Sequence, residues 1–308
     1  MQILKLKPYF SEKLWGGEKL KEFGFDLGQA QKIGEAWVVS AHKNGMSYVS
    51  EGEYKNLSLK ELFENHKHLF NNYQGQYPLL AKIITAKQNL SVQVHPDDEY
   101  ALKNHQQLGK PECWYVLDCD KDAEIIYGHH ARSAQELVEM INDQNWDQLL
   151  KKVKIKKGDF VYVPPGKVHA ISANVVVYEL QRSSDLTYRL YDYNRIDPKT
   201  SQTRRLDLDD AINCITVPDS QISIINQVNQ ELFSCKWFSI YLLDCSSTSV
   251  FQPTEKCDWL QLTVIKGQGT INGIDFKQGQ SAITIKGVEP LKVKGKITIV
   301  ICWIKNDE

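Results

Sequence analysis

Residues 91–97 of the chain read Ser-Val-Gln-Val-His-Pro-Asp, and they form the most specific pattern in the sequence. Side chains alternate between the two faces of a β-strand. Ser91, Gln93 and His95 therefore share one face, opposite two valines. Three polar side chains on one face are typical of a strand that lines a site. Pro96 has no backbone N–H to donate, so it should end the strand.

A short helix is predicted directly after this strand. It begins at Asp97–Glu99, whose carboxylates favour the positive N-terminal end of a helix. It ends at Gly109, because glycine commonly follows the last turn of a helix. The chain then enters a second predicted strand at residues 110–117, Lys-Pro-Glu-Cys-Trp-Tyr-Val-Leu, in which Lys110 and Glu112 share a face.

A third segment, residues 156–171, places Gly158, Pro164 and His169 five and four residues apart. This spacing predicts a turn, a short apolar strand, a Pro-Gly turn and then the histidine. Two histidines and one carboxylate suit a divalent ion such as zinc, with a coordination position open to substrate. The expected ligands are His95, Glu112 and His169, with Gln93 as a fourth. The alternative is that these histidines are hydrogen-bonded core residues.

The composition is that of an ordinary globular protein. The chain has 308 residues, enough for about two domains, and is 42% hydrophobic and 24% charged. Its net charge of −1 gives no strong field for nucleic acid or an anionic membrane. The sequence has neither an apolar run of membrane-spanning length nor a signal-peptide core near its start. Seven cysteines without CxxC spacing indicate reduced thiols, so we expect a cytoplasmic protein.

Two further expectations concern the middle of the chain. The two strand-like runs on either side of Asp118–Asp122 are expected to form a hairpin. A long helix should then begin after Ser133 and run through residue 153, with Ser133 and Glu136 forming a capping box. His129 and His130, just before this helix, are expected in a surface loop.

The last third of the chain repeats the pattern of the first part. Lys277–Ser281 corresponds to Lys156–Phe160, but no histidine follows it. This predicts an internal duplication whose second copy has lost the metal site. Many short strands at regular spacing favour antiparallel barrels or jelly rolls. We therefore expect a mainly β protein with two barrel domains, residues 1–217 and 218–308, and a few short helices in the N-terminal half.

These motifs resemble those of a known family. The spacing Gly-x5-Pro-x4-His resembles the second signature of the cupin fold. Six segments together look like the type I mannose-6-phosphate isomerases in their short bacterial form, and the similarity runs from about Pro8 to Asp192. The segments are LWGG (14–17), IGEAWVVSAHKNG (33–45), LSVQVHPDD (90–98), GKPECWYVL (109–117), VPPGKVHAI (163–171) and SSDLTYRLYD (183–192).

The resemblance implies two cupin-type jelly-roll barrels and a zinc-dependent aldose–ketose isomerase. Such an enzyme interconverts mannose 6-phosphate and fructose 6-phosphate through a cis-enediolate. The family's metal ligands correspond to His95, Glu112 and His169, with Gln93 matching a fourth ligand of some members. Arg189 matches the active-site arginine, Glu179 an acidic residue near the substrate, and Ser91, Lys82 and Lys110 match polar positions of the sugar-phosphate pocket. The large helical insertion of longer members is missing.

The chemistry of isomerisation fits these residue types. Zinc polarises a carbonyl, and the permanent charge of Arg189 can hold an enediolate or a phosphate. Glu179 is the candidate for the group that takes the proton from C2. Its alternative role is structural, as the partner of Arg189 or Arg182. Lys82 also has an alternative role, covering apolar surface with its head in solvent.

Three other functions compete with the isomerase. A non-catalytic sugar-phosphate-binding or regulatory cupin would keep the metal site, but the intact set of ligands and Arg189 argues against a retired enzyme. A metal-dependent dioxygenase would use more histidines. Nucleic-acid binding is disfavoured by the charge balance. We expect a small-molecule sugar phosphate as the partner, no nucleic acid or membrane, and a monomer or homodimer.

Overall fold

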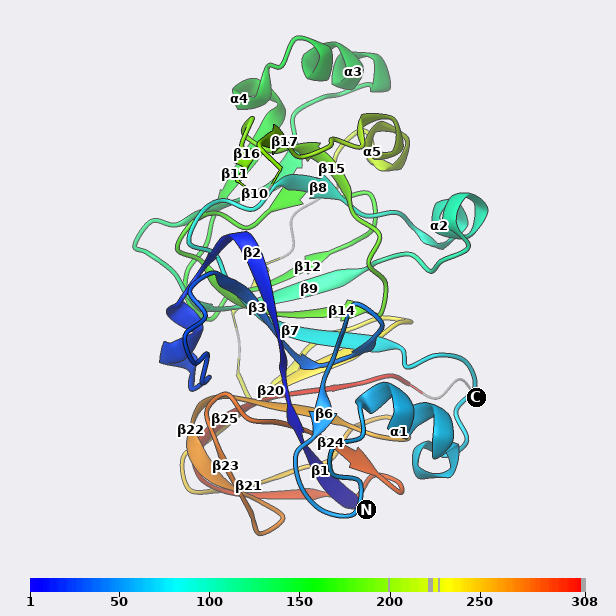
Figure 1. The fold of residues 1–308 in the computed structure, drawn as a ribbon, viewed down its shortest axis with the longest axis vertical. Helices are drawn as coiled ribbons and strands as arrows, with labels where there is room; N and C mark the ends of the chain where they lie inside the picture. Colours follow the sequence, from blue (N-terminus) through cyan, green and yellow to red (C-terminus); the bar gives the residue numbers. More distant parts are fainter. Residues whose placement is uncertain (199, 221–223, 227, 306–308) are drawn as a thin grey trace. The chain divides into compact units, whose positions relative to one another are not determined.

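The structure is a computed structural model that describes residues 1–198, 200–220, 224–226 and 228–305 (Figure 1). It is mainly β, as predicted, with short helices between the strands. The chain divides into two compact units. The first contains Met1–Glu12, Glu18–Ile84 and Asn226–Glu308, and the second contains Lys13–Gly17 and Thr85–Ile225.

The first unit is built on an antiparallel sheet with the strand order β19-β20-β25-β22-β24-β1-β6, in which β21 pairs with β25 and β23 with β22. Its apolar side chains form a core that includes Leu260, Leu262 and Ile299. The strands are β1 (Gln2–Lys7), β6 (Tyr48–Val49), β19 (Gln230–Ser234), β20 (Ser239–Cys245), β21 (Thr248–Phe251), β22 (Gln261–Ile271), β23 (Ile274–Lys277), β24 (Ser281–Ile285) and β25 (Leu291–Trp303).

Further elements of this unit lie before residue 86. β3 pairs with β7, and β4 forms a hairpin with β5. The elements are β3 (Ile33–Val39), β4 (Ala41–His42), β5 (Gly45–Met46), β7 (Leu79–Thr85), α1 (Leu59–Asn65) and the 3-10 helices η1 (Lys19–Phe23) and η2 (Lys67–Phe70). Strand β2 (Tyr9–Gly17) is divided between the two units.

The compact units follow a different division from the predicted domains 1–217 and 218–308. Residues 226–308 group with the first part of the chain because β1 pairs antiparallel with β24, Gln2 opposite Ile285 and Leu6 opposite Ser281. Local patterns in the last third of the sequence could not reveal that its sheet takes a strand from residues 2–7.

The second unit contains two groups of antiparallel strands, β11-β10-β13-β8-β15 and β18-β12-β9-β14. Figure 1 shows β8 and β10 above β9, β12 and β14. The strands are β8 (Val92–Val94), β9 (Glu112–Asp118), β10 (Glu124–His129), β11 (Leu150–Lys154), β12 (Phe160–Val163), β13 (His169–Ala170), β14 (Val176–Arg182), β15 (Tyr188–Tyr191), the pair β16 (Ile196–Asp197) and β17 (Gln202–Thr203), and β18 (Ile224–Ile225). The helices are α2 (Asp98–His105), α3 (Ala134–Asn142), α4 (Trp146–Leu149) and α5 (Leu208–Cys214).

A turn in the second unit carries the first copy of the predicted repeat. The backbone N–H of Lys156 donates to Oδ2 of Asp159 at 2.9 Å, and the Asp159 N–H donates back to the Lys156 carbonyl at 3.1 Å. Gly158 lies in the left-handed region with φ +93° and donates to the carbonyl of Val116 at 2.9 Å. The turn is thereby fixed to the middle of β9.

The second copy makes the same contacts in the first unit. The Lys277 N–H donates to Oε1 of Gln280 at 2.9 Å, and the Gln280 N–H donates back to the Lys277 carbonyl at 3.1 Å. Gly279, with φ +85°, donates to the carbonyl of Val264 at 2.9 Å. The correspondence between these two turns, on which the predicted duplication rests, is therefore present in their geometry.

The two turns also identify the position that corresponds to Glu112. Val264 occupies the place of Val116, so Leu260, four residues earlier, corresponds to Glu112. Leu260 belongs to the apolar core of the first unit. An aliphatic side chain therefore stands where the first copy has a carboxylate.

The predicted hairpin around Asp118–Asp122 is wrong. β9 pairs with β12 and β14, whereas β10 pairs with β11 and β13, so the chain passes from one sheet to the other at this turn. The Asp-rich signal indicates that the chain changes direction. Which strand becomes the neighbour depends on tertiary packing.

The single long helix predicted after Ser133 is also wrong. α3 ends before Asp143, Gln144 takes a left-handed conformation with φ +54°, and residues 150–154 form β11. The Ser133 hydroxyl accepts the N–H of Glu136 as predicted, but the Glu136 carboxylate accepts from a different N–H, that of Arg132. The pairing of β11 with β10 outweighs the helical pattern of the sequence.

Helix α2 ends earlier than predicted. Its left-handed C-cap is Gln106, with φ +54°, and not Gly109. Gly109 is needed for a different reason, because a Cβ atom there would lie 2.6 Å from the backbone carbon of Asp97.

His129 is not the surface-loop residue that the sequence indicated. Only 3% of it is exposed, and its Nε2 lies 3.0 Å from the carbonyl of Thr216. His130, the next residue, is exposed as expected. His129 is the last residue of β10 and pairs with Leu150, so it is buried by sheet formation.

Candidate metal centre

The structure brings together the three predicted metal ligands. His95 follows β8, Glu112 begins β9 and His169 begins β13, so both sheets of the second unit contribute. Their ligand atoms all lie within 4.8 Å of one another, and all three residues are buried. Nε2 of His95 is 3.2 Å from Glu112 Oε2, and Nε2 of His169 is 3.4 Å from Glu112 Oε1.

Local structure explains how these side chains are positioned. The turn after Pro164 brings the N–H of Gly166 to the carbonyl of His95 at 2.9 Å. Gly166 has φ +82°, and a Cβ there would lie 2.3 Å from Thr216 Oγ1, so glycine is required. The Pro-Gly turn of the sequence motif therefore joins the two histidine-bearing segments.

Backbone carbonyl groups orient both imidazole rings. Nδ1 of His95 lies 2.9 Å from the carbonyl of Leu186, and Nδ1 of His169 lies 2.8 Å from that of Lys167. A ring whose Nδ1–H donates to a carbonyl presents an unprotonated Nε2, which is the form that binds metal. These orienting groups belong to the backbone, so no sequence motif could have revealed them.

Gln93 also reaches the cluster. It pairs across the sheet with His169, and its Nε2 is 3.3 Å from Nε2 of that histidine. An amide binds a metal ion through its oxygen, and a half-turn of the amide exchanges the two atoms. Gln93 is therefore placed to serve as the predicted fourth ligand.

Lys110 and Glu112 form a buried ion pair. Lys110 Nζ is 3.1 Å from Glu112 Oε2 and 3.0 Å from Nε2 of His95. Burial alone would raise the pKa of Glu112, but the charge of Lys110 beside it outweighs this effect and holds the pKa well below its usual value. Burial, reinforced by Lys110, lowers the pKa of His95 to about 3, and burial also lowers that of His169. Glu112 is thus ionised and both histidines are neutral.

Glu112 provides a direct test of whether the cluster fits a metal ion. Within residues 1–198, 200–220, 224–226 and 228–305, Oε1 of its buried carboxylate has no hydrogen-bond partner, and Oε2 has no hydrogen bond beyond the 3.1 Å ion-pair contact with Lys110. A buried acceptor without a partner is costly, and a divalent cation would satisfy it. The ionised carboxylate, the neutral histidines and the unsatisfied oxygen all fit a divalent metal.

Arg189 lies beside the cluster. In the pairing of β15 with β8 it stands opposite Gln93, which places both side chains on the same face of the sheet. Its Nη1 donates to the carbonyl of Arg205 at 2.9 Å, and its buried Nε has no hydrogen bond within the described part of the chain. Burial, together with the nearby Arg204, lowers its pKa below the ordinary value. The Nε–H of this guanidinium group is therefore available to donate to a ligand beside the centre.

Glu179 lies on the strand next to Glu112. In the pairing of β14 with β9 it stands opposite Trp114, and Gln181 stands opposite Glu112. The Trp114 indole donates to Glu179 Oε2 at 3.2 Å and its ring lies 5.5 Å from that of His169. Glu179 is 4% exposed. Trp114, which the sequence analysis did not single out, thus contacts both Glu179, the predicted base, and His169, a predicted metal ligand.

The other predicted residues are also buried. Ser91 precedes β8, and Lys82 lies on β7 in the first unit, 6% exposed, with Nζ 5.2 Å from the ring centre of Trp37. The alternative that the head of Lys82 lies in solvent is therefore wrong. The alternative partner Arg182 is paired with Asp98.

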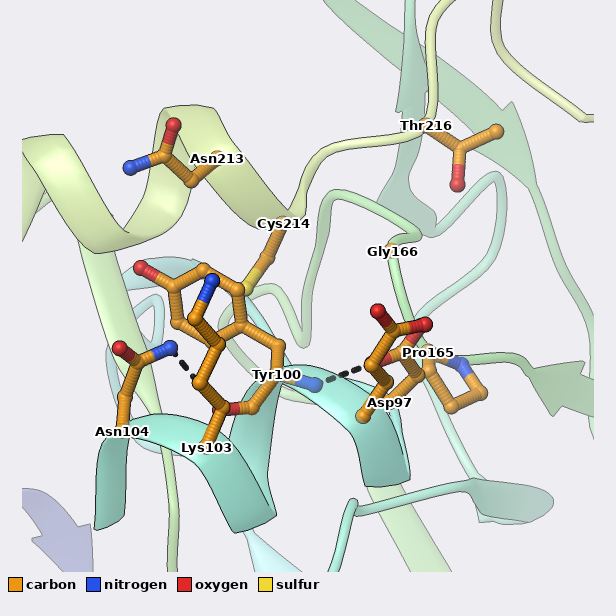
Figure 2. A pocket seen from close by; sticks show the side chains of 10 residues that line it. Asp97, Tyr100, Lys103, Asn104, Pro165, Gly166, Asn213, Cys214 and Thr216 are labelled. Carbon is orange, nitrogen blue, oxygen red and sulfur yellow. Dashed lines mark hydrogen bonds between the residues drawn. The ribbon is translucent and has the colours of Figure 1, made fainter.

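A polar cavity of about 510 Å³ lies near the backbone segment that carries His95 (Figure 2). Asp97, Tyr100 and Lys103 from the segment of α2 line it, together with the Pro165-Gly166 turn and the end of α5. It contains none of the predicted ligands. Gly166, which contacts His95 through the backbone, is shared by both features.

Two arginines near Arg189 were not identified from the sequence, namely Arg195 and Arg204, which pair with Asp192. The buried carboxylate of Asp192 accepts from Arg204 Nε at 2.7 Å and also pairs with Arg195. Burial by itself would raise the pKa of Asp192, but the two arginines lower it below the ordinary value. The alternation of Tyr and charged residues at 188–192 was the available signal for this arrangement.

Two general expectations can also be compared with the structure. All seven cysteines are free thiols, as predicted. Among the described residues, no helix has the length and apolar character needed to cross a membrane.

A buried cluster of two histidines and a carboxylate, joined by strands of two sheets, defines a metal-binding protein of the cupin type. The family model for the catalytic domain of type I phosphomannose isomerase matches residues 3–126. The mannose-6-phosphate isomerase ManA of Bacillus subtilis is 42% identical over 311 residues, covering 97% of this chain and 98% of ManA. The chain belongs to the type I mannose-6-phosphate isomerase family, and it is an enzyme of that family.

Solved structures agree in fold. The mannose 6-phosphate isomerase from Bacillus subtilis superposes with a TM-score of 0.90 at 38% identity, covering 99% of this chain and all of that chain. A mannose 6-phosphate isomerase bound with zinc and yttrium superposes with a TM-score of 0.79 at 16% identity, covering 99% of this chain and all of that one. The second match supports the fold alone.

Proposed function

We propose that the chain interconverts mannose 6-phosphate and fructose 6-phosphate through a cis-enediolate, with zinc held by His95, Glu112, His169 and Gln93. The observation that carries this proposal is the buried cluster itself, in which an ionised carboxylate and two neutral imidazoles converge within 4.8 Å. The family shown by the comparisons supplies the reaction and the substrate.

Zinc is the proposed ion for chemical reasons. Imidazole nitrogens and one carboxylate are typical ligands of catalytic zinc, which also keeps a position open for substrate. Such an ion supplies Lewis acidity that polarises the substrate carbonyl and stabilises negative charge on oxygen.

Arg189 and Lys110 are proposed to bind the developing anion and the phosphate. Arg189 stays charged at any physiological pH and has unsatisfied donor capacity beside Gln93. Lys110 lies within hydrogen-bond distance of both Glu112 and His95, so its ammonium group can turn from Glu112 to a substrate oxygen.

Glu179 is proposed as the base that moves the proton between C2 and C1. It lies on the same face as Glu112, two residue pairs further along β9 and β14, and the Trp114 indole donates to one of its oxygens. A buried carboxylate held in this way can accept a proton from substrate. Arg189 and Glu179 thus form the proposed catalytic pair.

The remaining roles rest on the sequence resemblance. Ser91 and Lys82 are proposed to contact the sugar phosphate, and residues 218–308 are proposed to have no part in metal binding. We also propose a cytoplasmic location and a monomer or homodimer. A non-catalytic, regulatory role is the competing function, and it predicts ligand binding without turnover.

A turnover assay tests the proposal directly. Purified zinc-loaded protein is given mannose 6-phosphate, and fructose 6-phosphate is measured. His169→Ala should abolish turnover, while His130→Ala, which changes an exposed histidine, should leave it intact. Tight zinc binding without turnover would refute the isomerase and favour the regulatory function.

A further inference from the structure

A second cavity lies on the opposite side of the five-stranded sheet from the metal centre. Val92, Val94 and Ile126 of this sheet belong to an apolar cluster beneath the helices, whereas the alternate residues Gln93 and His95 belong to the metal centre. The cavity has a volume of about 640 Å³ and is lined in part by Ile126. The sheet therefore separates this cavity from the metal centre.

Three half-buried aromatic rings line the cavity. Trp146 and Tyr191 stack with their centres 4.6 Å apart and their planes at 16°, and Tyr193 lies 4.9 Å from Tyr191. Flat aromatic surfaces at the wall of a polar cavity are suited to the C–H face of a sugar ring. The C–H groups carry slight positive charge and meet the negative face of the ring system.

Amide and hydroxyl groups also line the cavity beside the aromatic rings. Asn145 and Gln144 from the segment between α3 and α4 line the cavity, as does Ser172 after β13. Such groups both donate to and accept from hydroxyl groups. An apolar platform with a few fixed polar groups is the usual composition of a small-molecule site, and the volume lies in the usual range of such sites.

The charge of the cavity discriminates between possible sugars. Asp122, Glu124 and Asp147 line it, against the single lysine Lys152 among its lining residues. This excess of carboxylates repels a phosphate group. The preferred ligand is therefore uncharged, unlike the substrate proposed for the metal centre.

The backbone around this cavity is held in uncommon conformations. Asp122, Gln144 and Tyr193 all line it, and they have φ values of +61°, +54° and +56°. A left-handed conformation is uncommon for any residue other than glycine and costs about 1 kcal/mol or more. Three such residues around one cavity indicate that the placement of their side chains is maintained at a cost in stability.

We propose that the cavity formed by Trp146, Tyr191, Tyr193 and Asn145 binds an uncharged hexose ring, either as a free sugar or as the terminal unit of an oligosaccharide. The site is separate from the metal centre and does not depend on the proposed isomerase reaction. The ring stacks on the aromatic wall, and its hydroxyl groups bond to the amides.

Methyl α-D-mannopyranoside and methyl β-D-glucopyranoside are suitable probes. Their rings cannot open, so an aldose–ketose isomerase cannot convert them. Saturation-transfer NMR at millimolar glycoside concentration should show the C–H protons of each sugar ring close to protein protons. The signal should persist in His169→Ala protein, which separates this site from the metal centre. Absence of saturation transfer from the protein to both glycosides would overturn the proposal.

Variants of one tryptophan provide the decisive comparison. Trp146→Ala should weaken glycoside binding about fivefold to tenfold, because it removes one stacking surface, and Trp146→Phe should retain most of it. Trp237→Ala, in the first unit, is the matched control and should have no effect. If Trp146→Ala unfolds, Asn145→Ala serves instead and should weaken binding about threefold. Unchanged binding in these variants would place the sugar elsewhere and refute the site.

Two additional ligands define the class of sugar. Mannose 6-phosphate should not displace the glycosides from His169→Ala protein, since the cavity is acidic. Equal competition would refute an uncharged ligand. Mannotriose binding more tightly than the methyl glycosides indicates the end of an oligosaccharide, and equal affinity indicates a free sugar.

Discussion

Replacing Glu112 by Gln removes the carboxylate of the metal centre while keeping the shape of the side chain. Loss of a group that only orients a ligand already weakens metal binding about 10–100-fold, so loss of a ligand should weaken it by at least about 100-fold. That factor corresponds to about 2.7 kcal/mol. Zinc, the proposed ion, would stabilise the folded protein in proportion to its binding free energy, so the variant should lose this amount of zinc-dependent stability. At about 2–4 °C per kcal/mol, the zinc-dependent rise in Tm should be about 5–10 °C smaller.

The assay compares thermal unfolding of each protein with zinc and after chelation, so that any effect of the substitution on the metal-free protein cancels. Glu179→Gln is the matched control, because it makes the same change at a buried glutamate of the neighbouring strand, outside the ligand cluster. It should keep the full zinc-dependent rise. If Glu112→Gln also keeps that rise, Glu112 is not a ligand and the assignment of the centre is refuted.

Three further outcomes follow from the contacts. The folded-state pKa of Asp192 is lowered, so the stability it contributes is present above the unfolded pKa of about 4 and is lost as pH falls through the folded pKa. Asp192→Asn should lower the free energy of unfolding by about 2–3 kcal/mol at pH 7, measured in urea. It should also make the stability less dependent on pH in the acid range. Gly166→Ala should weaken zinc affinity and cost about 1–3 kcal/mol, whereas Gly28→Ala, with open space at its Cβ, should leave zinc affinity unchanged. Leu260→Glu should cost more than about 4 kcal/mol by denaturant unfolding, and Leu260→Met less than about 1.5.

The metal cluster could be predicted because strand periodicity and turn residues are local signals. His95 and Gln93 share a face by alternation, and Pro96 ends the strand whatever surrounds it. The ligands converge because each stands at the end of a strand. The conformation of the Pro-Gly turn, with Gly166 in the left-handed region, is also set locally.

Apart from the end of helix α2, the failed predictions concern partners that lie far away in the sequence. The turn at residues 118–122 is visible in the sequence, but the sheet that β10 joins is not. His129 is buried only because β10 pairs with β11, and the pattern after Asn142 is helical until that pairing overrides it. The orienting carbonyls of Leu186 and Lys167 leave no trace in residue type at all.

The pairing of β1 with β24 has a consequence for synthesis on the ribosome. Strand β1 is made first, but its partner at Ser281–Ile285 emerges near the end of translation. At about 5–20 residues per second, β1 waits roughly 15–50 s before it can be covered. The second unit is nearly continuous in sequence and contains every proposed metal ligand, so it can fold while translation continues. The nascent chain can therefore acquire its metal before the rest of its architecture exists.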